Sequence, residues 1–421
     1  MLWTEVVAGL TTFVTMAYII VVNPAILEAA GLPRGPSMTA TILTAAIGSA
    51  VMGLYANRPF AIAPYMGENA FIAYTVCAGM GFSWRAALGA VFLSGVAFIV
   101  LTLTRLRVAL AEAIPAPLRS SFAVGIGLFL AFIGLNEMGV VQVGVEGAPV
   151  RLGDLTEPSV LVGVGTFIGM EVLALRRVPG AILLAILAGT AAAFLTGVAD
   201  PPDALVSSPP SLAPIFAKCD LSETLSPAFW NVTLVVFVMA FLDTIATLIG
   251  VSNRAGFLDA DGRLPQMERP MLADAVATTL AGLLGTTTAG AYIESAAGVE
   301  AGGRTGLTAL VVAVLFLSAL FFAPILTAVP ACAFGPALVA VGLLMVQAVL
   351  RIPFDRPEEA IPAVAVIVLM SFTYNIAIGM TAGFVLYPLF MAAAGRVREV
   401  RPGMWALAAL SLLLFVFYPR S

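Results

Sequence analysis

Long apolar stretches alternate with short polar ones along the whole chain. Each apolar stretch approaches the roughly 20 residues that an α-helix needs to cross a bilayer about 30 Å thick. The polar gaps leave no room for a soluble domain, and we therefore predict an all-α polytopic membrane protein. The stretches that predict spanning helices are Val6–Ile26, Thr39–Tyr55, Ala86–Leu103, Phe122–Met138, Val160–Leu175, Ile182–Thr196, Leu234–Val251, Leu307–Phe322, Ala337–Leu350, Ala363–Phe372 and Ile378–Ala394.

The distribution of basic residues predicts how the chain is oriented. With the N-terminus in the cytoplasm and seven helices in each half, fifteen basic residues lie in inside loops and four in outside loops. This bias is the one that the positive-inside rule requires. The inside set is Arg58, Arg105, Arg107, Arg119, Arg176, Arg177, Arg254, Arg263, Arg269, Arg304, Arg351, Arg356, Arg396, Arg398 and Arg401, and the outside set is Arg34, Arg85, Arg151 and Lys218.

These positions predict a multi-pass protein of the plasma (inner) membrane, surrounded by lipid, with a cytoplasmic N-terminus. We expect no cleavable signal peptide, because the first apolar stretch has full length and no basic start. A last apolar stretch, Trp405–Phe417, is left over, and it would span, re-enter or lie in the interface.

The two halves of the chain also repeat each other. FVTMAY (Phe13–Tyr18) is similar to FVMAF (Phe237–Phe241), and YMGENAF (Tyr65–Phe71) is similar to YIESAAG (Tyr292–Gly298). Seven helices per half is an odd number, so the second repeat must be inverted in the membrane, as in many transporters. We expect a first repeat over residues 1–200, a Pro-rich outer loop over 201–226, a second repeat over 227–396, and a C-terminal basic stretch with an extra apolar segment over 397–421.

Each half contains one interrupted segment that is too short to span. Asn57–Pro64 and Gly285–Ala291 predict short extended stretches before half-helices in segments 3 and 10. Half-helix N-termini there would offer free N–H groups at mid-bilayer depth. Glu294 follows the second interruption, and a carboxylate inside a membrane is costly unless it has a function or a partner. Together these groups suit a flat, neutral molecule with donors and acceptors on one edge.

Four separated motifs resemble one known family. TEVVAGLTTFVTMAYIIVVNPAIL (Thr4–Leu27), APYMGENAFIAYTV (Ala63–Val76), FLDTIATLIGVSNRAGFLDADG (Phe241–Gly262) and YIESAAGVEAGGRTGLTA (Tyr292–Ala309) look like the AzgA-like purine permeases of the nucleobase–cation symporter family 2, within the nucleobase/ascorbate transporter superfamily. The resemblance implies about fourteen transmembrane segments in a 7+7 inverted repeat with core and gate domains. It also implies uptake of guanine, hypoxanthine or adenine with protons, and a homodimer packed through the gate domains.

The resemblance assigns roles to particular residues. Glu294 matches the tenth-segment position that binds the base, and Asp243 matches an eighth-segment acid that binds substrate and is implicated in proton coupling, in which we also include Glu294. Asn69 matches the third-segment asparagine, and Tyr292 matches a ring or backbone contact to the base. We add Ser295 to the binding set. Supporting positions are Asp274 and Thr247.

Two residues depart from the family pattern, and some residues have a structural interpretation as well. Tyr65 and Glu68 stand where a small residue and an apolar or hydroxyl residue are expected, and Glu68 adds a carboxylate to the predicted binding set. Glu294 and Asn69 would alternatively cap helices, and Asp243 would be tied to a neighbouring threonine. Glu300 and Arg304 are spaced for a local salt bridge.

Other function classes fit less well. A uracil, xanthine or other planar-donor carrier of the same fold is the nearest alternative, and an anion carrier should lack the central carboxylates. The absence of histidine removes the usual nucleophile–base pair and most zinc chemistry, so we expect no enzyme. A channel would not give saturable uptake. Three cysteines without metal spacing predict no metal site, and we expect no cofactor and no nucleic-acid partner.

Overall fold

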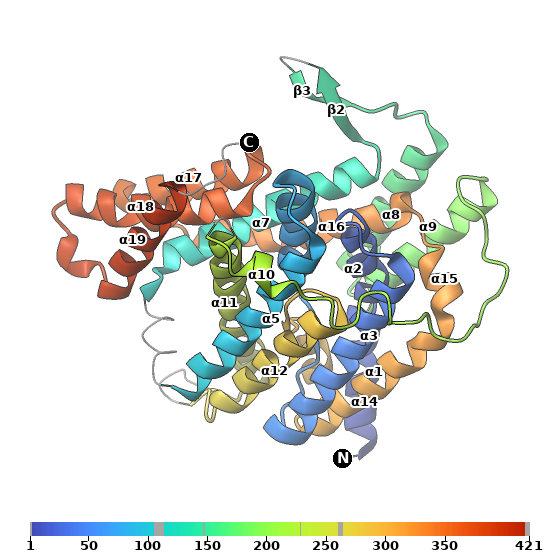
Figure 1. Ribbon diagram of the computed structural model, residues 1–421. Helices are drawn as coiled ribbons and strands as arrows, with labels where there is room; N and C mark the ends of the chain where they lie inside the picture. Colours follow the sequence, from blue (N-terminus) through green and yellow to red (C-terminus); the bar gives the residue numbers. More distant parts are fainter. Residues whose placement is uncertain (1, 105–112, 146–147, 228, 260–263, 417–421) are drawn as a thin grey trace.

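The computed structural model describes residues 2–104, 113–145, 148–227, 229–259 and 264–416, and it is mostly helical (Figure 1). Within these ranges, nine helical stretches are long and apolar enough to cross a membrane. Three more helices, α9, α12 and α17, are shorter or more polar, and two segments are interrupted. Together they account for the fourteen segments that the sequence predicts.

The first seven segments follow the predicted order, with a break in segment 1 that was not predicted. The chain turns at Ala17 and Tyr18 between α1 and α2. Segment 3 consists of a short strand, a short helix and a π-helical stretch. The bounds are α1 (Leu2–Met16), α2 (Ile19–Glu28), α3 (Arg34–Val51) with a π-helical turn (Met52–Ala56), β1 (Ile62–Pro64), α4 (Met66–Ala70) with its π-helical extension (Phe71–Gly79), α5 (Trp84–Leu103), α7 (Ala116–Glu137), α8 (Pro158–Leu175) and α9 (Ala181–Leu195).

The second seven segments repeat this arrangement, including a broken tenth segment. Gly285 ends α12 with a φ of 98°, a left-handed conformation that suits glycine, and the chain then becomes extended. The bounds are α11 (Trp230–Ala255), α12 (Glu268–Leu284), β4 (Ala289–Ala291), α13 (Ser295–Glu300), α14 (Gly306–Ala319) with α15 (Ala323–Thr327), α16 (Ala331–Val346), α17 (Pro357–Phe372) and α18 (Ile376–Ala393).

The two interruptions meet, because β1 and β4 pair as antiparallel strands. Ile62 lies opposite Ala291, and Pro64 lies opposite Ala289. All six strand residues are buried. Non-helical backbone at membrane depth must find hydrogen-bond partners inside the protein, and the pairing supplies them. The predicted extended stretches before the half-helices are confirmed.

The helices form two groups that mix both halves of the chain (Figure 1). In the core group, α1 packs against α14, α3 against α14 and α12, and α5 against α12 and α11. In the gate group, α7 packs against α16 and α17, α8 against α9 and α16, and α17 against α18. Each group therefore combines segments that are far apart in sequence, such as the blue α1 and the orange α14 in Figure 1.

Small residues set the closest crossing of the gate group, between α7 and α16. A Cβ atom at Gly342 would lie 2.3 Å from the carbonyl oxygen of Gly127, and one at Gly127 would lie 2.6 Å from the carbonyl oxygen of Gly342. Gly134 and Gly335 form a second such pair along the same two helices: a Cβ atom on either would lie within 3.0 Å of the carbonyl oxygen of the other. These helices are the fifth segment of each half, so the crossing is reciprocal. Helices in membranes gain most of their association energy from such close packing.

Outside the spanning segments, the structure adds elements that the sequence analysis did not predict. β2 (Val141–Val145) and β3 (Ala148–Leu152) form an antiparallel hairpin that projects from the helical body (Figure 1). A short helix, α10 (Leu221–Thr224), interrupts the long outer loop. The last apolar stretch forms α19 (Pro402–Val416), which packs against α18 and α11. The predicted positions Arg105, Arg107, Arg263 and Phe417 lie outside the described residues.

One predicted ion pair is wrong. Glu300 does not pair with Arg304; its carboxylate accepts a hydrogen bond of 2.9 Å from Arg254 at the end of α11. Arg304 instead donates to the carbonyl oxygens of Val299 and Gly303. The spacing rule for a helix fails here because α13 ends at Glu300, so the four-residue interval is no longer helical.

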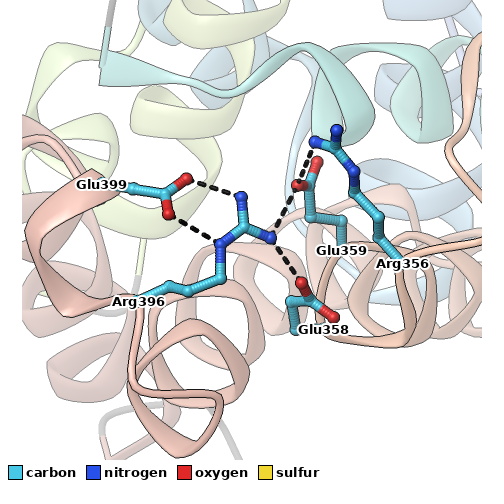
Figure 2. A network of polar contacts seen from close by, with 5 residues as sticks. All are labelled: Arg356, Glu358, Glu359, Arg396 and Glu399. Carbon is cyan, nitrogen blue, oxygen red and sulfur yellow. Dashed lines mark hydrogen bonds and ion pairs between the residues drawn. The ribbon is translucent and has the colours of Figure 1, made fainter.

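Ionic contacts join the ends of α17 and α18 on the predicted inner side (Figure 2). Arg396 bonds the carboxylates of Glu358, Glu359 and Glu399, and Arg356 also pairs with Glu359 at 3.3 Å. The hydrogen bonds from Arg396 hold the pKa of the Glu399 carboxyl below its usual value. This contact is therefore complete at neutral pH and is lost as the pH falls through that lowered pKa.

The reciprocal glycine crossing predicts opposite effects for the same substitution at two places. Gly342→Ala forces α7 and α16 apart and should destabilise the protein by about 1–3 kcal/mol, the usual cost of overpacking. Gly169→Ala in α8 meets no atom within 4 Å and should be neutral or stabilising by up to about 1 kcal/mol, because alanine favours helix. Thermal melting of the purified variants in detergent measures both. Equal melting temperatures for the two variants would contradict the close packing of α7 against α16 at Gly342.

Candidate functional site

Polar side chains gather around the paired strands, at the centre of the core group. They come from six places: the break between α1 and α2, α2 itself, the α4 turn, α11, α12, and the start of α13 with the residues before it. Most of them are buried, and two carboxylates are only partly so. The residues that meet here are Tyr18, Asn23, Tyr65, Glu68, Asn69, Asp243, Thr244, Asp274, Tyr292, Glu294 and Ser295.

Glu294 is held by a hydroxyl group from the first segment. The Tyr18 hydroxyl donates a hydrogen bond of 2.7 Å to its Oε1 atom. The Glu294 side chain makes no capping hydrogen bond to α13, so the alternative role as a helix cap is not supported. The residue is half-buried, and its neighbour Ile293 is 61% exposed. Glu294 therefore presents a fixed acceptor at the accessible edge of the site.

Asp243 occupies the middle of α11 and is also half-buried. Within the part of the chain that the structure describes, it forms no ion pair. Thr247 lies one turn further along the helix and is half-buried too. Below them, Ala246, Gly250 and Asn253 leave the same side of α11 partly or fully exposed. A stripe of small and polar residues thus leads from Asp243 to the end of the helix that is predicted to be cytoplasmic.

Asn69 belongs to a fully buried chain of amide and hydroxyl groups. Its Nδ2 donates to Asn23 Oδ1 at 2.8 Å, and Asn23 Nδ2 donates to Thr41 at 2.7 Å and Thr286 at 2.9 Å. The Asn69 Oδ1 atom has no partner among the described residues. The network fixes the amide of Asn69 and leaves its acceptor unused. An isolated cap residue would need no such network.

Tyr65 and Tyr292 form a parallel pair of rings where the strands end. Their centroids are 6.1 Å apart, with planes inclined by only 5°. The Tyr292 hydroxyl donates to the Pro64 carbonyl oxygen, and the Tyr65 hydroxyl is 3.2 Å from the hydroxyl of Thr244. Tyr65, the departure from the family pattern, is therefore part of the wall of the site. The pair offers an aromatic surface with its polar ends already bound.

Other polar groups are buried and hydrogen-bond the strands. Asp274 accepts a hydrogen bond of 3.0 Å from the backbone N–H of Ala291, and Ser295 Oγ accepts one of 3.0 Å from Ala61. Ser49 on α3 does the same for Ile62 at 2.9 Å. All three side chains are fully buried. Asp274 thus bonds the backbone of β4, and Ser295 bonds the backbone of the residue before β1.

Glu68 lies inside the core group with no exposed surface, and neither carboxylate oxygen has a hydrogen-bond partner among the described residues. It does not reach the open side of the site in this conformation. The sequence analysis placed it with the substrate-binding residues because it is adjacent to Asn69. In a helix, adjacent residues point about 100° apart, which separates the two side chains.

The sequence analysis missed Tyr18 and Asn23. Both lie in the first segment, at and just after the turn that separates α1 from α2. A signal was present, since a tyrosine and an Asn-Pro pair interrupt an otherwise apolar stretch. An apolar count over the whole stretch hides such single polar positions.

On the predicted outer side, the core and gate groups are joined by hydrogen bonds. The Tyr74 hydroxyl donates to Glu137 at the end of α7 at 3.1 Å, and the Thr75 hydroxyl donates to the Tyr374 carbonyl oxygen at 3.1 Å. The Tyr374 ring also meets those of Tyr74 and Phe129 edge to face. The site is therefore closed on this side.

Comparisons with known proteins agree with this architecture. Residues 4–382 match the family model described as "Permease family". The chain is 38% identical to the adenine permease AdeP of Escherichia coli (strain K12), over 98% of this chain and 93% of AdeP. It is 39% identical to the guanine/hypoxanthine permease PbuG of Bacillus subtilis (strain 168), over 98% of this chain and 96% of PbuG.

A solved structure supports the fold. The transmembrane domain of the cyanobacterial bicarbonate transporter BicA has a TM-score of 0.67 at 18% identity, covering 91% of this chain and 97% of that domain. The likeness confirms the predicted fold class, a 7+7 inverted repeat with core and gate domains. The helices, the broken segments and the matched family together identify the chain as a multi-pass membrane transporter, not an enzyme, that belongs to the Permease family.

Proposed function

We propose that the chain is a secondary active transporter that imports purine nucleobases (guanine, hypoxanthine or adenine) by proton symport across the plasma (inner) membrane. The names of the relatives support the substrate class. The observation that carries the proposal is Glu294, a half-buried carboxylate fixed by Tyr18 where the two broken segments meet. The proposal includes a cytoplasmic N-terminus and, from the family resemblance, a homodimer packed through the gate domains.

Recognition of the base follows from the donors and acceptors at the site. Edge N–H groups of the base donate to Glu294, whose geometry is set before the ligand arrives. The Tyr292 ring, fixed through its hydroxyl, lies against the flat face of the base. Asn69 binds through its unused acceptor after a small rearrangement. Ser295 acts by holding β1 in place.

Coupling to protons is assigned to Asp243. Asp243 and Glu294 are both acidic, and no described basic side chain forms an ion pair with either. A proton on Asp243 and a base on Glu294 together reduce the charge that must move with the core group. When Asp243 releases its proton to the cytoplasm, its negative charge is restored. The empty site then returns to the outward-facing state. Thr247 and Asp274 support this arrangement from α11 and α12.

The direction of opening agrees with import ending in the cytoplasm. Hydrogen bonds close the outer side, whereas the exposed stripe on α11 runs from Asp243 toward the predicted inner end. We assign the structure to an inward-facing state. Import then requires separation of Tyr74 from Glu137 in the outward-facing state.

Uptake of radiolabelled hypoxanthine into proteoliposomes with an imposed inward proton gradient tests the function directly. We expect accumulation that a protonophore abolishes and that unlabelled guanine, adenine or hypoxanthine blocks. Inhibition by uracil or xanthine, with purines inert, would favour the alternative carrier on the same fold. Uptake driven by sodium alone would contradict proton symport.

Glu294→Ala should abolish binding of the base. In this variant the N–H donors of the bound base would lose water without gaining an acceptor, which costs about 1–3 kcal/mol for each unpaired group. We expect a loss of affinity of at least about 100-fold, measured by equilibrium binding to purified protein. Glu300→Ala is the matched control, since Glu300 is exposed at the other end of α13 and its carboxylate pairs with Arg254. Similar affinities in both variants would exclude Glu294 from the site.

Asp243→Asn should abolish accumulation while it preserves binding and exchange. The amide keeps the size of the side chain but cannot carry the proton. The measurement compares pH-driven uptake with counterflow of labelled base in the same vesicles. Retained pH-driven accumulation in the variant would show that another group couples transport to protons.

A further inference from the structure

Glu68 is a buried acid that the proposed recognition of the base does not use. It is fully buried, and both carboxylate oxygens lack a hydrogen-bond partner among the described residues. Asp274 is buried to the same degree, yet it accepts a hydrogen bond from the N–H of Ala291. A structural carboxyl group is normally satisfied in this way. Glu68 therefore has no evident structural role, and an unpartnered charge there would be strongly disfavoured.

The acid on the helix that faces Glu68 is Asp243, because α4 packs against α11. Two contacts bracket the pair. Next to Glu68, Gly67 approaches the methyl end of Met239, one turn before Asp243. Three residues before Glu68, the Tyr65 hydroxyl meets that of Thr244, the residue after Asp243.

The surroundings of Glu68 contain no compensating cation in the described part of the chain. From α2, the polar group near α4 is the Asn23 amide, which bonds Asn69. From α7, Ile126 packs against Gly67. Besides Asp243, the titratable groups near this helix are the phenols of Tyr65, three residues before Glu68, and of Tyr292, which stacks on Tyr65. A proton is therefore the simplest partner for this carboxylate.

We propose that Glu68 and Asp243 form a carboxyl pair that carries two protons for each base transported. The inference rests on the proposed function and adds a second coupling residue to it. Asp243 is half-buried and exchanges protons with water along the exposed side of α11, whereas buried Glu68 exchanges them through Asp243. An O–H bond forms on each carboxylate from outside water and breaks when the proton passes to inside water. No electrons are transferred.

The number of protons determines the equilibrium accumulation of base. With the membrane potential clamped at zero, a pH difference of one unit supports about tenfold accumulation for one proton and about 100-fold for two. Labelled hypoxanthine in proteoliposomes should reach the higher plateau with the wild-type protein. Glu68→Gln should lower the plateau about tenfold and preserve counterflow. Glu300→Gln, which removes an exposed carboxyl at the end of α13, should leave the plateau unchanged.

Several results would overturn the inference. A wild-type plateau at the one-proton level, or the same plateau with Glu68→Gln, would exclude Glu68 from coupling. If the wild-type protein shows no pH-driven accumulation, proton symport itself fails, and infrared spectroscopy of purified protein then tests the pair separately. A pH change should produce carboxyl C=O difference bands, one of which is lost in Glu68→Gln and one in Asp243→Asn. An unchanged spectrum in Glu68→Gln would show that Glu68 does not exchange its proton.

Discussion

Two short strands paired inside a helical membrane protein are the constraint on which this site depends. β1 and β4 interrupt two segments, and each exposes backbone groups that no bilayer can satisfy. The pairing satisfies the backbone groups on the facing edges of the strands, and side chains accept from N–H groups on the outer edges. The acceptors are Ser49 for Ile62, Thr278 for Ala289 and Asp274 for Ala291. Ser49 and Thr278 come from corresponding helices of the two halves, so the support repeats as the fold does.

The site that this pairing creates is acidic without basic partners. Glu294 is fixed by a phenol, Asp274 by a backbone N–H, and Glu68 by nothing that the described residues contain. An arginine or lysine at any of these positions would balance the charge permanently. Neutral hydrogen-bond donors fix the geometry of Glu294 and Asp274 instead. The charge of the carboxylates is then balanced by the protons or the ligand that enters the site.

Much of the fold followed from patterns with a single physical cause. Apolar length predicted the spanning segments, and the glycine- and proline-rich interruptions predicted the broken ones. The predicted salt bridge between Glu300 and Arg304 was wrong, because helix periodicity cannot show where a six-residue helix stops. Tyr18 was missed because its contact with Glu294 joins residues 276 positions apart. The hairpin formed by β2 and β3 was not predicted, because apolar length marks only spanning segments and these strands lie between two of them.

The crossing of α7 and α16 has a consequence for how the sequence can change over time. Each glycine there faces the backbone of its counterpart in the other half. A larger residue on one helix is tolerable only if the opposite helix moves away, and that movement displaces the second glycine pair as well. At these four positions, a substitution in one half of the chain is therefore constrained by the residue in the other half.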